Sequence, residues 1–154
     1  MFAAVDMLKQ TRRLIYYVTR NLSPAQAAYI PPGFDNNIVW NVGHVIVIQQ
    51  LYCYSLTGNE LLVSDKFYTM YDAGTSPADW KSEPDLQALL PLLRDHGQQL
   101  EADIASGKVA HFEPFASSSG VKINTLEEAL IFNSFHEGLH LGTIMAIKNL
   151  LPPS

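Results

Sequence analysis

A run of 24 residues, from Asn36 to Asn59, contains no aspartate, glutamate, lysine or arginine. Its most apolar part, residues 38–56, is interrupted by polar side chains that include Asn41, His44, Gln49 and Gln50. It therefore falls short of the roughly 18 uninterrupted apolar residues that a membrane-spanning helix requires. A helix that is apolar on both sides must instead be covered by protein on both sides. We expect no membrane partner for this chain.

Composition is consistent with a protein that buries much of its surface. The chain has 154 residues, of which 47% are hydrophobic and only 16% charged, against about 25% charged in an average soluble domain. This excludes intrinsic disorder and predicts a single domain over residues 1–154. The net charge of −5 argues against nucleic-acid binding, which needs clustered Lys and Arg. The lone Cys53 and the absence of a secretory signal pattern predict a cytoplasmic location.

Hydrophobic spacing and helix-capping residues predict an all-α fold. We expect four long helices at about 4–22, 35–56, 84–106 and 125–151, with Pro91 either kinking the third helix or marking its true start. Thr125 and Glu128 form a predicted capping box at the start of the last helix. Short helices are expected at 25–29 and within 60–82, and a loop at 108–124. This pattern predicts a four-helix bundle with long connections and short extra helices.

Three histidines lie on helix faces that we expect to point into the core. His136 and His140 are four residues apart, so their imidazoles project about 40° apart around the helix axis. His44 shares a face of the second long helix with Trp40 and other apolar residues. Burying three unpaired polar rings is costly, and a divalent cation would satisfy all three nitrogens. Three protein ligands leave one coordination position free, as in a catalytic metal site.

Other interpretations of these histidines stay open. His44 alone would more often be a hydrogen-bonded core residue, and an HxxxH pair alone occurs by chance. All three could also be satisfied core groups without a metal. We expect His96 to be solvated and His111 to lie in a loop, and we exclude both from the site.

We expect none of the other polar residues near the three histidines to be a metal ligand. Glu137 could accept a hydrogen bond or act as a base, but we interpret it as a carboxylate on the helix surface. Cys53 is expected to face away from His44, so it is neither a ligand nor a nucleophile. The side chains of three asparagines could line a pocket or cap local backbone: Asn37, Asn41 and Asn133.

Two blocks of sequence resemble the DinB-like superfamily of metal-binding four-helix bundles. The first comprises residues 22–34 and 36–44, which end in Trp-Asn-Val-Gly-His, and the second comprises residues 125–130 followed by His-Glu-Gly-Leu-His-Leu-Gly at 136–142. The resemblance implies that His44, His136 and His140 form the metal triad, most often for zinc or nickel, in a bundle that often dimerises. Some relatives are thiol-dependent S-transferases, and others are described as metal-dependent hydrolases on the triad alone.

The favoured hypothesis is therefore a metal-dependent enzyme. A cation with three neutral ligands would lower the pKa of bound water toward about 7, or bind and ionise a substrate thiol. Hydrolysis and thiol S-transfer of a small molecule both stay open, and no catalytic residue beyond the triad is assigned. The alternative is a non-enzymatic metal-binding or stress-response module.

The back of the last helix predicts self-association. The positions opposite its histidines are small or apolar, namely Ile131, Ser134, Gly138, Leu141, Gly142 and Met145. A solvated face would be polar. We expect a homodimer whose interface uses the outer surfaces of the second and fourth long helices.

Overall fold

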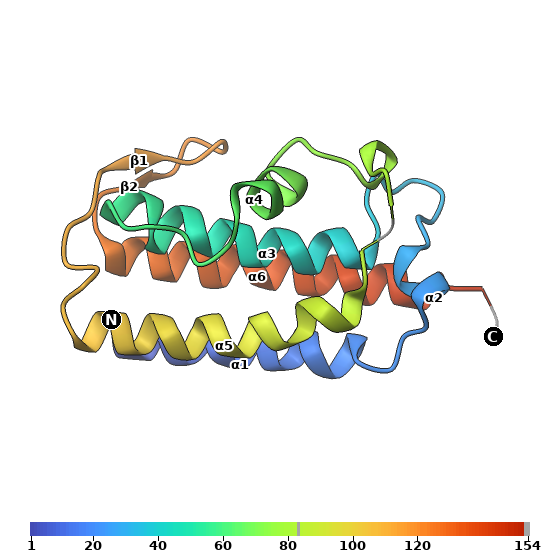
Figure 1. Ribbon diagram of the computed structural model, residues 1–154, viewed down its shortest axis with the longest axis horizontal. Coiled ribbons are helices and arrows are strands. Elements are labelled where there is room, and N and C mark those ends of the chain that lie inside the picture. Colours follow the sequence, from blue (N-terminus) through green and yellow to red (C-terminus); the bar gives the residue numbers. More distant parts are fainter. Residues whose placement is uncertain (83, 153–154) are drawn as a thin grey trace.

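The computed structural model describes residues 1–82 and 84–152, and within them four long helices form a bundle (Figure 1). Each long helix packs against two others, in the cyclic order α1, α6, α3, α5. The predicted all-α fold, with short helices in the connections, is confirmed. The elements are α1 (Phe2–Thr19), α2 (Pro24–Ala28), α3 (Ile38–Cys53), η1 (Ser55–Thr57), α4 (Asp65–Tyr71), η2 (Pro77–Asp79), α5 (Leu86–Ala105), β1 (Phe115–Ala116), β2 (Lys122–Ile123) and α6 (Leu126–Asn149).

The helix ends follow their capping residues. Asn37 caps α3 by accepting a hydrogen bond from the backbone N–H of Trp40, so this helix begins later than the predicted residue 35. Thr125 caps α6 through the N–H of Glu128, but the Glu128 carboxylate accepts from the N–H of Asn124 rather than from Thr125. Only half of the predicted capping box therefore forms.

The structure decides one alternative that the sequence left open, at Pro91, and differs from the prediction in one connection. Pro91 lies inside α5, which starts at Leu86 and bends away from α1 over its first turns (Figure 1). The predicted loop at 108–124 contains a short antiparallel hairpin in which Phe115 pairs with Ile123. Each strand has only two residues, and the turn between them is rich in serine and glycine. The sequence pattern therefore indicated a loop and not a hairpin.

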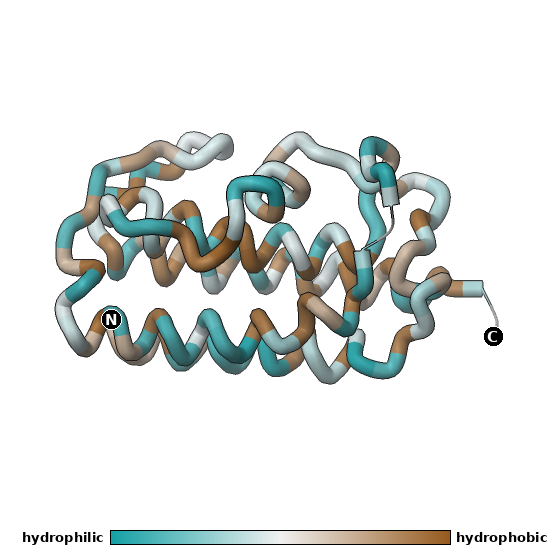
Figure 2. Tube along the Cα trace, viewed as in Figure 1, coloured by the Kyte–Doolittle hydropathy of each residue, from teal (hydrophilic) through white to brown (hydrophobic). Residues whose placement is uncertain are grey.

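Helix α3 is buried on all sides within one chain. Fifteen of its 16 residues are buried, so it has no solvated face. The other long helices cover one side, and α4 with the segment around it covers the other (Figure 1). Figure 2 shows hydrophobic residues in this covering segment too, and Leu61, Leu62 and Val63 pack against the core. The outer surface of α3 is therefore not free for a dimer interface, contrary to the prediction.

None of the helices in the described residues is long and apolar enough to cross a membrane.

The outer face of α6, in contrast, exposes large apolar side chains. Ile131 and Phe135 are each 60% exposed, Leu139 is 55% exposed and Met145 is 49% exposed. A Cβ atom added at Gly138 or Gly142 would meet nothing within 4 Å. The predicted apolar back is thus present at Ile131, Gly138, Gly142 and Met145, whereas Ser134 and Leu141 are half-buried. Phe135 and Leu139 belong to the exposed face instead.

Candidate metal centre

The bundle brings His44, His136 and His140 together. His44 lies in the second turn of α3, and the other two lie on adjacent turns of α6, which packs against α3. One candidate ligand atom from each ring lies within 4.8 Å of the others. The sequence prediction that these three imidazoles converge is confirmed. The group they form could hold a metal ion.

Hydrogen bonds orient two of the rings. The Nδ1 atom of His44 lies 2.7 Å from the backbone oxygen of Tyr71, and the Nδ1 atom of His140 lies 2.7 Å from Oδ1 of Asn41. The Asn41 amide nitrogen donates to the Asn37 carbonyl, which fixes its oxygen toward the histidine. Since both acceptors are oxygens that cannot donate, each Nδ1 carries the proton, and each Nε2 keeps a lone pair for a cation.

The spacing of the free nitrogens fits a shared ion. The Nε2 atoms of His136 and His140 lie 3.2 Å apart. Two nitrogens bound to one tetrahedral zinc at its usual bond length are about 3.3 Å apart. The Nδ1 atom of His136 is buried without a hydrogen-bonding partner among the described residues, so this ring is the least constrained of the three. The donor set and its spacing therefore suit a divalent transition metal.

Burial keeps the rings neutral at pH 7. Desolvation, together with the charge of the neighbouring histidines, lowers the pKa of His136 to about 4 and that of His140 to about 3. Desolvation also lowers the pKa of His44, although the Tyr71 carbonyl and the Asp72 carboxylate act in the opposite direction. Neutral imidazoles are the form that ligates metals.

An aromatic ring supports His44 from the other side. The ring of Trp40 stacks on His44 with 4.5 Å between centroids and an angle of 12°. The Trp40 Nε1–H donates to the Thr75 hydroxyl, which lies in the covering segment. The chain between α3 and α5 therefore helps to build the site.

The comparison with known families agrees with this geometry. The family model of the DinB superfamily matches residues 7–144, which include all three histidines. The chain belongs to the DinB superfamily. No curated protein matches the chain.

In this DinB-superfamily chain, the sequence interpretation of Glu137 as a surface carboxylate is wrong. Glu137 is completely buried rather than on the helix surface, and it pairs with Arg12 of α1 at 2.8 Å. Asn133 also donates a hydrogen bond to the same carboxylate. The buried stripe of α6 runs through Asn133, Glu137 and Ile144, so the histidines lie at its edge rather than at its centre. Arg12, at a core position of the first helix, was the sequence signal for this pair.

The expectation that His96 is solvated is also wrong. His96 is only 7% exposed, its ring contacts the amide of Gln50, and desolvation lowers its pKa to about 4. His111 lies exposed in a loop as predicted. Burial raises the pKa of the Cys53 thiol to about 12, which makes it a poor nucleophile.

Proposed function

We propose that His44, His136 and His140 bind a divalent transition metal, zinc or nickel, and that the protein is a metal-dependent enzyme acting on a small molecule. The observation that carries this proposal is the convergence of three neutral imidazoles, two of them held at Nδ1 so that Nε2 is free. A cation with three neutral ligands supplies a Lewis acid able to activate a water molecule or a thiol. Hydrolysis and thiol S-transfer are both compatible with it.

The residues of the chain have separable roles in this proposal. The Tyr71 carbonyl and the Asn41 side chain hold two rings in the ligating tautomer. Trp40 shields one face of His44 from solvent. Glu137 is occupied by Arg12 and Asn133, so it is not a free base. Proton transfer is therefore left to the substrate, to solvent or to a group that the ligand brings.

Metal analysis of protein purified without an affinity metal tests the binding step. We expect about one equivalent of a transition metal per chain, and its loss in His44→Ala and in His140→Ala. His111→Ala, an exposed histidine elsewhere, is the matched control and should leave the metal content unchanged. Less than about a tenth of an equivalent, unchanged by His44→Ala, would contradict the proposal.

Ester and thiol substrate panels test the catalytic step. Turnover that requires added metal and disappears in His140→Ala supports the enzyme. Tight, reversible metal binding without turnover of any ester or thiol would instead support the alternative, a non-enzymatic metal-binding module. Glu137 is already paired with Arg12 and is not free to act as a general base, and this observation favours the alternative.

We also propose that the chain forms a homodimer through the outer face of α6. Between Glu128 and Lys148 this helix carries one charged residue, Glu137, and that residue is buried. The exposed apolar residues on this face, together with Met7 and Leu14 on the adjacent α1, form a surface that a monomer would leave in water. A second copy of this face would cover it.

A further inference from the structure

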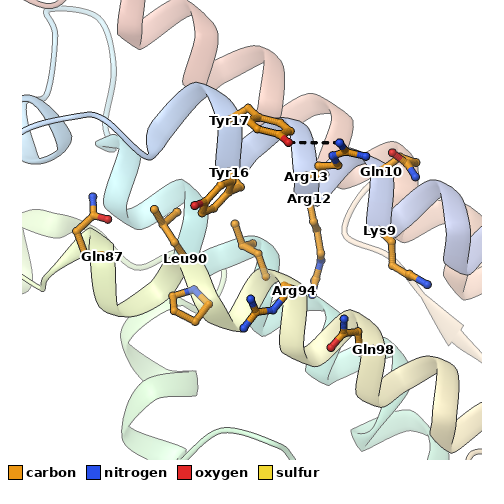
Figure 3. Close-up of a pocket in the computed structure, with 12 residues that line it drawn as sticks. Lys9, Gln10, Arg12, Arg13, Tyr16, Tyr17, Gln87, Leu90, Arg94 and Gln98 are labelled. Carbon is orange, nitrogen blue, oxygen red and sulfur yellow. Dashed lines mark hydrogen bonds between the residues drawn. The ribbon is translucent and has the colours of Figure 1, made fainter.

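A groove of about 580 Å³ lies between α1 and α5, separate from the histidine triad (Figure 3). Its volume is within the range of small-molecule sites. It lies along the part of α5 that contains Pro91, where this helix bends away from α1 (Figure 1). None of the three histidines lines it.

The walls of the groove are cationic although the protein as a whole carries a net charge of −5. Lys9, Arg12, Arg13 and Arg94 line it, and none of the described lining residues is acidic. Three of these cations have carboxylate partners: Arg12 pairs with a buried glutamate, and Lys9 and Arg94 pair with residues of α5 outside the lining. Arg13 makes no ion pair among the described residues.

The free charge is concentrated around an aromatic ring. Arg13 donates to the Tyr17 hydroxyl at 3.3 Å, and the guanidinium groups of Arg13 and Arg20 lie 5.4 and 5.1 Å from the centre of that ring. Within the described part of the chain, no carboxylate pairs with Arg20 either. Two arginines without a carboxylate partner among the described residues therefore flank Tyr17, which lines the groove.

The rest of the lining consists of aromatic and apolar side chains and of glutamines. Tyr16 lies on the α1 wall, and Leu90 and Pro91 lie on the α5 wall (Figure 3). Gln87 and Gln98 add amide donors and acceptors at the rim. An apolar surface bounded by cations and amides complements a molecule that has an apolar body and one anionic group.

We propose that the α1–α5 groove binds a small organic anion with an aromatic body, whose anionic group lies beside Arg13 of α1, the lining cation that has no carboxylate partner among the described residues. The aromatic body packs against Tyr16 and Leu90. The guanidinium of Arg12 does not contact the ligand, because Glu137, Gln49 and the Val45 carbonyl already occupy it. The site is independent of the proposed metal.

Fluorescence titration with naphthalene-2-sulfonate tests the site, with 2-naphthol as a neutral analogue and inorganic sulfate as a ligand without an apolar body. We expect saturable binding of the sulfonate, and binding weaker by about tenfold for 2-naphthol and for sulfate. The double variant Arg13→Glu with Arg94→Glu should weaken sulfonate binding by about tenfold. Both residues are exposed, so the variant is expected to fold, and circular dichroism checks this.

Control variants separate this groove from the other surfaces. Lys66→Glu with Lys122→Glu makes the same charge change at exposed lysines outside the groove and should leave binding unchanged. His44→Ala should also leave it unchanged. Tyr16→Ala, which removes an aromatic wall without changing charge, should weaken it. Equal affinity for sulfonate and 2-naphthol, full binding by the arginine double variant, or loss of binding in Phe135→Ser on α6 but not in the arginine variant would each overturn the proposal.

Discussion

Arg12 of α1 and Glu137 of α6 form an ion pair that is hidden from solvent, with side chains 1% and 0% exposed. The same guanidinium donates to Gln49 and to the backbone oxygen of Val45, both on α3. One side chain therefore joins three of the four long helices. Burial raises the pKa of Glu137, whereas the guanidinium of Arg12 and the amide of Asn133 act against this shift.

Replacing one partner of this pair should be strongly destabilising. In Glu137→Gln the positive charge of Arg12 stays buried without a counter-ion, and we expect the free energy of unfolding to fall by about 3–5 kcal/mol. Urea denaturation measures it. Glu101→Gln, which breaks the partly exposed pair with Lys9, is the control and should cost less than about 1 kcal/mol. Equal losses in the two variants would contradict the assigned role.

Asn41 should control metal affinity without contacting the metal. Asn41→Ala removes the acceptor for His140 Nδ1 and is expected to weaken metal binding by about 10- to 100-fold. Competition with a chelator of known affinity measures this. Asn41→Asp retains an oxygen acceptor and should restore most of the affinity. If both variants bind metal like the original chain, Asn41 does not orient the ring.

Gly43 should be intolerant of any side chain. A Cβ atom there would overlap the ring of Tyr71, whose backbone oxygen holds His44. Gly43→Ala is expected to lower the free energy of unfolding by about 1–3 kcal/mol and to weaken metal binding as well. Gly142→Ala has free space in the single chain and should be neutral or stabilising by up to about 1 kcal/mol in dilute solution.

His96 should contribute to acid sensitivity. Its pKa is lowered to about 4 by desolvation and by the positive charge of Arg12, while Asp95 acts in the opposite direction. As the pH drops, the unfolded chain therefore binds a proton at His96 before the folded chain does. The free energy of unfolding should fall between about pH 6.5 and pH 4. His96→Gln should reduce this decline in urea denaturation at pH 7 and pH 5. The exposed His111→Gln should leave it unchanged.

The proposed dimer can be tested by sedimentation at micromolar concentration. Phe135→Ser with Ile131→Ser should shift the chain toward the monomer, because both side chains are 60% exposed on the apolar face of α6. Val121→Ser, at another exposed apolar position, should have no effect. A wild-type chain that sediments as a monomer would contradict the proposal.

Local patterns were sufficient to predict the helices and the His136–His140 pair, because caps, periodicity and residue spacing act within a few turns. His44 was added because an unpaired imidazole on an apolar helix face would be costly to bury. The pairing of Glu137 with Arg12 was not predictable in this way, since the partners are 125 residues apart. The covering of α3 was missed for a similar reason. The sequence of an apolar helix shows that both of its sides must be buried, but it does not show which part of the protein buries them. Here the chain's own 60–82 segment covers α3, rather than a second copy.

The acceptor for His44 is a main-chain oxygen, and this changes how the site can be lost. No side-chain substitution at Tyr71 deletes that oxygen, so the hydrogen bond depends on the position of Tyr71 and of α4 rather than on a functional group of the side chain. Insertions or deletions in the connection between α3 and α5 would therefore shift this hydrogen bond to His44 while all three histidines are retained. In an alignment of the three histidines alone, such variants would be indistinguishable from this chain.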